Sequence, residues 1–287
     1  MTRLPNKIVD FHVHLFPDRM FDAVWRHFAE VYKWDVIYQL YYKETVSHLR
    51  ERNIGPIVYS NYAHRAGVAA GLNDWNKKIL DEVEDLYCFG AFSPLDDDAM
   101  KIARDAITHP KMLGFKLQLL VQEHYPADER FFPLYDLVME RNKRILFHVG
   151  NGPAGNRFVG YDNFKKLLDR YPDLPCNVAH MGGMEYTEFM ALLDHHENLY
   201  LDTSFTFVPK MATFFGLEEI FADLKGFWGD SLEKHKRRIV YGSDFPNLIF
   251  PREDEIECLV GLDLSREFYD MVFYENGVGL IGEHAGD

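Results

Sequence analysis

Three polar side chains alternate with apolar ones near the start of the chain, in Ile8-Val9-Asp10-Phe11-His12-Val13-His14. Successive side chains of a β-strand point to opposite faces, so Asp10, His12 and His14 should share one face and the apolar residues the other. Unpaired imidazoles are costly inside a protein, and a bound metal removes that cost. The segment therefore favours a metal site. The spacing alone is weak evidence, because a chain with 13 histidines often holds such a pair by chance.

Other polar residues stand where predicted strands end. His148, His180 and Asp244 each close a short apolar run. The carboxyl ends of barrel strands form one rim, and barrel enzymes place their active residues there. A single histidine at a strand end is more often a core residue than a ligand. The coincidence of these three positions with His12 and His14 indicates one shared site.

The elements that must position these residues repeat along the chain. Short β-rich runs alternate with longer stretches that carry helical signals, for example at 96–107, 133–141 and 163–171. This alternation predicts an α/β fold, a (β/α)8 TIM barrel. The alternative is an open doubly wound sheet, but the Gly-rich turn typical of that fold is missing. The expected strands span 8–14, 54–60, 86–93, 114–121, 144–150, 176–181, 199–204 and 239–243.

Length and composition support one globular domain. The 287 residues suit a barrel, which commonly needs about 250 residues. The net charge of −14 argues against nucleic-acid partners, and no apolar run resembles a secretory signal or a membrane span. Cys88, Cys176 and Cys258 lack C-x-x-C spacing, so we expect buried, reduced thiols in a cytoplasmic protein.

The motifs together resemble a known family. Asp10-Phe11-His12-Val13-His14, His148, His180 and Gly242-Ser243-Asp244-Phe245-Pro246 look like the amidohydrolase superfamily. Within it, the chain is most similar to the amidohydrolase-related branch, which holds small metal-dependent hydrolases and aminocarboxymuconate-semialdehyde decarboxylase-like enzymes. The similarity extends to the closing segment 274–282. It implies a single TIM-barrel domain of the metal-dependent hydrolase type over 1–287.

The resemblance implies a mononuclear site, usually zinc, held by His12, His14, His148 and Asp244. Nitrogen ligands with one carboxylate suit Zn²⁺ and leave a position for water, and Mn²⁺ is the alternative. Asp244 would take a proton from that water and deliver it to the leaving group. His180 would orient the water or stabilise the developing oxyanion. Asp10 is expected to orient an imidazole from beneath, or equally to be a buried carboxylate bonded within the barrel floor.

Four further residues are candidates for substrate binding. Lys116 lies on the fourth strand, where binuclear relatives can carry a carboxylated lysine; in this branch it would rather meet substrate or a carboxylate, or be a solvated lysine. Arg65 and Arg157 lie on loops at the rim, and either guanidinium could hold a substrate carboxylate or be plain surface charge. His64 lies near the same mouth. The aromatic excursion at 15–53 would form a lid, a dimer contact or an extra helix on the core.

Three functions fit these residues. The first is hydrolysis of a small ester, lactone or amide by metal-activated water. The second is metal-dependent nonoxidative decarboxylation of an unsaturated or aromatic carboxylic acid. The third, a non-catalytic metal-binding barrel, is disfavoured because structural zinc sites usually have closed Cys or His shells. Hydrolysis is preferred because decarboxylases of this branch tend to be longer. The expected partner is a small-molecule substrate, and relatives are often homodimers.

Overall fold

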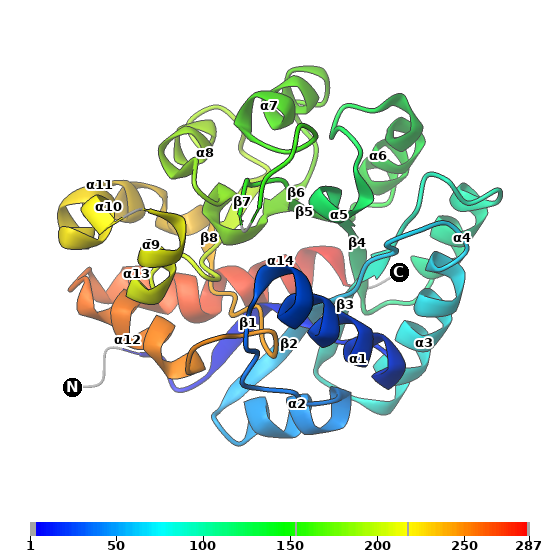
Figure 1. Cartoon of the computed structure of the whole chain (residues 1–287). Helices are drawn as coiled ribbons and strands as arrows, with labels where there is room; N and C mark the ends of the chain where they lie inside the picture. The colour runs from blue at the N-terminus through cyan, green and yellow to red at the C-terminus, as the bar shows by residue number, and fades with distance from the viewer. Residues whose placement is uncertain (1–3, 153, 217, 286–287) are drawn as a thin grey trace.

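The computed structural model describes residues 4–152, 154–216 and 218–285. Eight parallel strands pair in sequence order from β1 to β8, which confirms the predicted barrel (Figure 1). Backbone bonds close the ring, since the Asp244 amide donates to the His12 carbonyl (2.7 Å) and the His14 amide to the Phe245 carbonyl (2.8 Å). The strands are β1 Ile8–His14, β2 Ile54–Ser60, β3 Leu86–Ala91, β4 Met112–Gln118, β5 Arg144–His148, β6 Cys176–Val178, β7 Leu199–Asp202 and β8 Ile239–Val240.

Helices surround the strands, and α14 crosses behind the barrel in the view of Figure 1. The α-helices are α1 Asp18–His27, α2 Tyr42–Arg50, α3 Ala69–Glu82, α4 Ala99–Ala106, α5 Leu119–Gln122, α6 Phe132–Glu140, α7 Tyr161–Arg170, α8 Tyr186–Leu192, α9 Pro209–Phe215, α10 Glu218–Ala222, α11 Leu224–His235, α12 Arg252–Gly261, α13 Arg266–Asp270 and α14 Asn276–His284. Shorter 3-10 or π-helical turns are η1 Phe28–Tyr32, η2 Glu129–Phe131, η3 Ala179–Gly182, η4 Lys236–Arg238 and η5 Met271–Glu275.

The first two strands have the predicted bounds, whereas β6 and β8 are shorter than expected. Strand β6 ends at Val178 because the chain turns into η3, where His180 has a left-handed backbone with φ of 57°. The chain after β8 also leaves extended geometry, and Asp244 has φ of 62°. Short polar side chains such as Asp tolerate this region better than β-branched ones. Both irregular segments carry predicted site residues.

The apolar side chains of β1 do not lie where they were expected. Val9 and Phe11 were expected on the face opposite to His12, away from the barrel interior, but they pack with Val58, Phe89 and other apolar residues from strands around the barrel and with α14. The rings of Phe11 and Phe89, which belong to β1 and β3, lie 5.9 Å apart. A cluster that joins strands across the barrel must fill its interior. Strand β1 is irregular between Asp10 and Val13, which allows Phe11 and His12 both to point inward.

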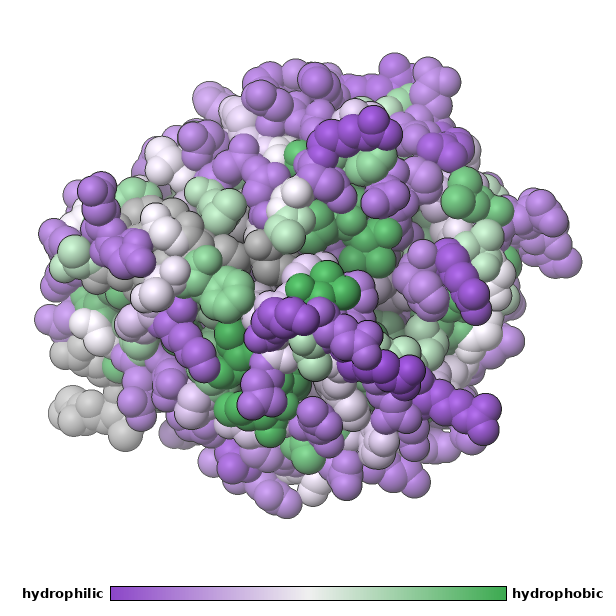
Figure 2. Space-filling view, in the orientation of Figure 1, coloured by the Kyte–Doolittle hydropathy of each residue, from purple (hydrophilic) through white to green (hydrophobic). Residues whose placement is uncertain are grey.

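The excursion between β1 and β2 folds over the carboxyl ends of the strands. Its α1 and η1 lie across the front of the barrel in Figure 1, opposite to α14. Hydrophobic residues gather near the middle of this face and hydrophilic ones around it (Figure 2). No helix among the described residues is long and apolar enough to span a membrane. Of the three thiols, Cys88 and Cys176 are buried and Cys258 is half-buried.

Candidate metal centre

Three predicted residues converge at the carboxyl ends of β1 and β8. The Nε2 atoms of His12 and His14 lie 3.3 Å and 3.0 Å from Oδ1 of Asp244. Their ligand atoms all lie within 4.8 Å of one another. The histidine side chains are buried, whereas that of Asp244 is 13% exposed. This trio has the donor set of a site for a borderline divalent cation such as zinc.

The imidazoles of His12 and His14 are oriented by hydrogen-bond acceptors at their Nδ1 atoms. Nδ1 of His12 lies 2.9 Å from Oδ2 of Asp202, and Nδ1 of His14 lies 3.2 Å from the Ser60 carbonyl. An acceptor at Nδ1 favours the tautomer with the proton there, which leaves the Nε2 lone pair free. Both Nε2 atoms lie next to Asp244, and that of His12 also lies 3.3 Å from Nζ of Lys116. The residues present therefore fit a metal ion.

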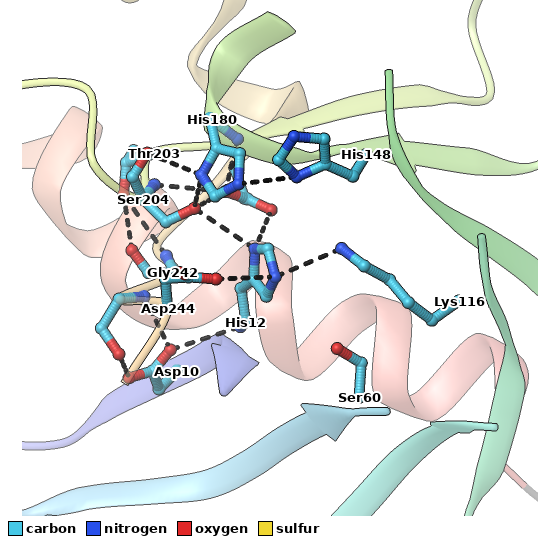
Figure 3. Close-up of polar contacts among 12 residues, drawn as sticks. Asp10, His12, Ser60, Lys116, His148, His180, Thr203, Ser204, Gly242 and Asp244 are labelled. Carbon is cyan, nitrogen blue, oxygen red and sulfur yellow. Dashed lines mark hydrogen bonds and ion pairs between the residues drawn. The ribbon is translucent and has the colours of Figure 1, made fainter. Parts of the chain in front are cut away.

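His148 and His180 form a pair beside the trio. Nδ1 of His148 lies 3.2 Å from Nε2 of His180 (Figure 3). Nε2 of His148 lies 3.0 Å from the Gly152 carbonyl. The His180 ring lies 5.3 Å from the His12 ring, centroid to centroid. The structure thus places His148 next to the three converging residues, and it faces His180 rather than Asp244. A cation or a proton between the facing nitrogens would relieve their lone-pair repulsion.

Asp202 was missed by the sequence analysis although it ends β7. It is fully buried and belongs to a second group of ligand-type atoms with His12 and His180. Donors already occupy this carboxylate, because Oδ2 meets His12 and Oδ1 accepts from the amides of His180 and Ser204. Asp202 is therefore better placed to orient His12 than to bind a metal. The expected strand 199–204 placed it before the strand end, so the strand-end rule did not select it.

The contacts of Asp10 bear on the two roles that were expected equally for it. Its carboxylate accepts from the amide (3.0 Å) and the hydroxyl (2.5 Å) of Ser243 and from the His12 amide (3.3 Å). It touches no imidazole, because the irregularity in β1 turns it away from the histidines. Burial raises the pKa of Asp10 to about 7, which the Ser243 bond and the Arg252 charge partly oppose. The alternative of a buried carboxylate bonded within the barrel fits these contacts.

Lys116 approaches the trio from the opposite side. The side chain is fully buried, and its Nζ lies 3.3 Å from Nε2 of His12 (Figure 3). It is therefore not the solvated lysine that was one of the alternatives. Burial lowers the pKa of Lys116 to about 8, while Asp202 and Asp244 act in the opposite direction. The protonated amine of Lys116 and a metal ion compete for the lone pair on Nε2 of His12. This competition weakens when the lysine side chain moves away or loses its proton.

Burial keeps most of the imidazoles neutral. It lowers the pKa of His12, of His148 and of His180, and neighbouring positive charges such as Lys116 add to the effect. For Asp244, burial alone would raise the pKa, but the imidazoles of His14 and His12 lower it well below its usual range. Neutral imidazoles and an ionised carboxylate are the protonation states that metal binding requires.

A close backbone approach brings Asp244 to the histidines. A Cβ atom on Gly242 would lie 2.6 Å from Cβ of His12, a distance that real side chains do not tolerate. Only glycine allows the chain after β8 to pass this near to β1. The left-handed turn at Asp244 then directs the carboxylate toward His14.

The centre opens into a cavity of about 580 Å³. His14, His148, His180 and Asp244 belong to its wall, while apolar side chains form most of the remainder. Much of that apolar wall comes from the 15–53 excursion, which therefore covers the site. These wall residues include Phe16, Met20, Val24, Phe28, Tyr32 and Trp34. A pocket with a few polar groups in an apolar wall is typical of small-molecule sites.

The predicted substrate contacts divide into two groups. His64 and Arg65 line the cavity and are exposed, and Arg19 of α1, which the sequence analysis missed, joins them. Arg157 does not line the cavity, and its guanidinium lies over the Phe158 ring, 4.7 Å from the centroid. Lys116 lies below the cavity floor and does not line it either. Only the first group can meet a substrate in this conformation.

Comparison with known proteins agrees with this architecture. A family model described as amidohydrolase matches residues 9–279. A search of curated protein sequences gave no match. The sequence match covers every residue of the trio and of the histidine pair.

Solved structures share the fold at low sequence identity. An uncharacterized TIM-barrel protein from Bordetella bronchiseptica is 13% identical, with a TM-score of 0.73 over 98% of this chain and 100% of that one. A probable 2-pyrone-4,6-dicarboxylic acid hydrolase from Acinetobacter baumannii is 15% identical (TM-score 0.64, 96% and 99% coverage). A dihydroxybenzoic acid decarboxylase from Polaromonas sp. JS666 with bound manganese is 14% identical (TM-score 0.69, 97% of both chains). These similarities show the fold alone.

Proposed function

The chain belongs to this amidohydrolase family, and we propose that it is a metal-dependent hydrolase that acts on a small ester, lactone or amide. One observation carries the proposal. The Nε2 atoms of His12 and His14 converge on Asp244 at the wall of an apolar cavity. A carboxylate that both touches the ligand nitrogens and reaches the cavity is suited to handle the proton of an attacking water.

His12, His14 and Asp244 would hold one divalent metal, with His148 as the fourth ligand. We propose Zn²⁺, with Mn²⁺ as the alternative. A bound divalent metal supplies water with a pKa lowered to about 7. The histidines contribute their lone pairs, and Asp202 fixes the His12 ring.

Asp244 would accept a proton from the attacking water and return it to the leaving oxygen or nitrogen. His180 reaches the same cavity and would orient the water or donate to the substrate oxygen as charge develops there. The apolar wall would exclude bulk water and strengthen these polar contacts. Among the described residues, the proposal requires no group besides Asp244 and His180 to accept or donate a proton.

Decarboxylation is the second candidate, and the cavity gives a reason to keep it. Its apolar wall with Arg19 and Arg65 suits a ring that bears a carboxylate. A related fold belongs to 2,6-dihydroxybenzoate decarboxylase as well as to the pyrone hydrolases. The same residues could then serve to protonate a ring carbon.

Product analysis separates the two reactions. The purified protein with Zn²⁺ or Mn²⁺ would be assayed in ¹⁸O-labelled water against lactones, aryl esters, amides and unsaturated or aromatic acids. Release of a labelled acid supports hydrolysis. Release of CO₂ without label in the product overturns it in favour of decarboxylation.

Metal analysis tests the site itself. We expect about one equivalent of metal per chain, and loss of that metal in His14→Ala. The same change at His195, which is exposed beyond α8, should leave the metal in place. Two equivalents of metal per chain would instead support a carboxylated Lys116 that bridges two metals. Full metal content in a folded His14→Ala variant would contradict the proposal that His12, His14 and Asp244 hold the metal.

A further inference from the structure

Tyr62 is a polar residue of the cavity that neither the metal centre nor the proposed proton transfers use. It follows β2 in the loop 61–68, and its side chain lines the cavity together with His14 and Asp244. Its ring meets the His14 ring edge to face, with centroids 6.1 Å apart, and the Phe16 ring at 5.4 Å. These two rings fix the direction of the phenol.

The backbone on both sides of Tyr62 is anchored. Nδ2 of Asn61 donates to the Leu15 carbonyl at 3.2 Å, and Nε2 of Gln122 donates to the Ala63 carbonyl at 3.1 Å. Both bonds join the loop to neighbouring elements of the barrel rim. Tyr62 therefore stands on a fixed segment, as a group that must be preorganised does.

The Tyr62 hydroxyl has no hydrogen-bond partner among the described residues. It differs from Nε1 of Trp34 in the same wall, which is also unpartnered but buried within the protein. The hydroxyl is not one of these buried orphans, so it opens into the cavity. An ordered O–H that faces an enclosed space without an internal partner is available to a ligand.

The charge next to this hydroxyl is that of Asp244. Oδ1 of Asp244 lies 3.0 Å from Nε2 of His14, and the Tyr62 ring packs against the same imidazole. Tyr32, another phenol of the wall, packs instead against the rings of the excursion itself. Tyr62 therefore lies beside the proposed reacting centre, and Tyr32 lies farther from it. A phenol is a donor at neutral pH, and a donor at this point suits an oxygen that gains negative charge.

We propose that Tyr62 is a catalytic residue whose hydroxyl donates a hydrogen bond to the substrate oxygen held next to Asp244. This inference rests on the proposed function only in taking Asp244 as the reacting centre. The donated bond strengthens as the substrate oxygen becomes an oxyanion, and no covalent step involves the phenol. His180 would approach the same oxygen from the β6 side.

The test compares Tyr62→Phe with Tyr32→Phe, two variants that each remove one hydroxyl from the same cavity. The probe is phenylphosphonate, whose ring suits the apolar wall and whose oxygens mimic an oxyanion. Calorimetric titration of the zinc-loaded proteins should show binding weakened about 10- to 100-fold in Tyr62→Phe and less than about twofold in Tyr32→Phe. Thermal melts should coincide, because the Tyr62 hydroxyl makes no internal bond.

Turnover gives a second measurement. With an aryl ester that the wild-type protein hydrolyses, kcat should fall about 100-fold in Tyr62→Phe while KM stays nearly constant. A change confined to KM would assign Tyr62 to ground-state binding and overturn the catalytic role.

Each remaining outcome decides the proposal. Equal binding by wild type and Tyr62→Phe overturns it, as does an equal loss in both variants or the absence of phenylphosphonate binding to wild type. The proposed function fails separately. If zinc is bound but no ester, lactone or amide is hydrolysed, the phenylphosphonate titration still decides whether Tyr62 contacts an oxyanion. If no zinc is taken up, the same titration of the metal-free wild type and variants decides it.

Discussion

Buried ionisable side chains lie at both ends of the barrel, and the two ends satisfy them in different ways. The amino-terminal end, which α14 covers, holds Arg144, Lys143 and His284. The carboxyl-terminal end holds the histidines, Asp244 and Lys116. The same residue types serve at both ends, so their surroundings must explain any difference in role.

At the amino-terminal end nearly every donor has an acceptor. Arg144 donates to Oδ1 of Asn177 and to the carbonyls of Cys176 and Asn198, each at 2.8 Å. His284 lies between Arg144, 3.2 Å from its Nε2, and the Asn142 carbonyl, 2.7 Å from its Nδ1. Such a network fixes one structure, although Nδ2 of Asn177 has no partner within it among the described residues.

At the carboxyl-terminal end, potential ligand atoms face one another or the cavity. Two Nε2 lone pairs meet at Asp244, and His148 and His180 present facing nitrogens. His180 and Asp244 have left-handed backbones, a conformation that the surrounding structure must hold in place. The comparison teaches that incomplete internal satisfaction, more than burial, marks the end that awaits a ligand. Changes at this end should alter chemistry, and changes at the other should alter stability.

The largest effect is expected for Asp244→Asn. An amide cannot accept the proton of an attacking water, so hydrolysis should fall about 10³-fold or more. Turnover per folded molecule, with the melting temperature measured alongside, checks this. The matched control is Asp169→Asn, which only breaks an exposed pair with Lys165. Activity within tenfold of wild type would remove Asp244 from the mechanism.

Arg144→Met should reverse that pattern. It removes a donor from the buried Cys176 carbonyl, from Oδ1 of Asn177 and from His284, so the free energy of unfolding should fall by about 3 kcal/mol. Activity per folded molecule should persist, because the change lies at the other end of the strands. Urea denaturation measures the loss. Arg141→Met, at an exposed side chain, should cost less than about 0.5 kcal/mol; equal costs would contradict the contrast.

The pH dependence of stability should also report the amino-terminal end. Burial and then Arg144 lower the pKa of His284 to about 4, from an ordinary 6.5. Between these values the unfolded chain binds a proton that the folded chain refuses, so stability falls as the pH falls through this window. The contribution is on the order of 2 kcal/mol.

His284→Gln should remove this part of the slope, since glutamine keeps a donor and an acceptor but does not titrate. Denaturation at pH 7 and pH 4.5 provides the measurement. The same substitution at exposed His195 should keep the wild-type slope. An unchanged slope in His284→Gln would instead assign the acid sensitivity to the histidines of the metal centre, at the carboxyl-terminal ends of the barrel strands.

A smaller effect at the site should come from the carboxylate behind His12. Asp202→Asn weakens the bond to Nδ1, so metal affinity should fall about 10- to 100-fold without loss of the fold. Competition with a chelator measures the affinity. Asp10→Asn is the control, because this carboxylate touches no imidazole. If Asp10→Asn lowers the affinity as much, the contrast between the two buried carboxylates is wrong.

The two carboxylates also show what the sequence could predict. Period and spacing predicted the barrel, and the strand-end rule placed His12, His14 and Asp244 at one rim. An irregular β1 broke strict alternation, so Asp10 was assigned to the wrong face. Asp202 lay inside the expected strand 199–204 and not at its end, because that strand stops two residues earlier than expected. No local pattern tells which carboxylate meets an imidazole, because that depends on β1 and β7 meeting in space.

Loop residues were harder to place for the same reason. Arg65 and Arg157 both follow strands, and the sequence offered the same argument for each. In the structure, Arg65 lines the cavity while Arg157 packs over Phe158. The direction of a long side chain on a loop depends on tertiary contacts that no motif records.

The smallest predicted effect comes from substitution of these two arginines, of which one lines the cavity and the other does not. Arg65 is exposed, so its attraction for an anion is screened, and Arg65→Met should weaken benzoate binding only about threefold. Arg157→Met should leave binding unchanged, because its charge points elsewhere. Calorimetry on the zinc-loaded protein is the measurement, repeated at high salt, where the difference should shrink. Weaker binding in Arg157→Met would mean that the segment 154–160 turns toward the cavity once an anion is present.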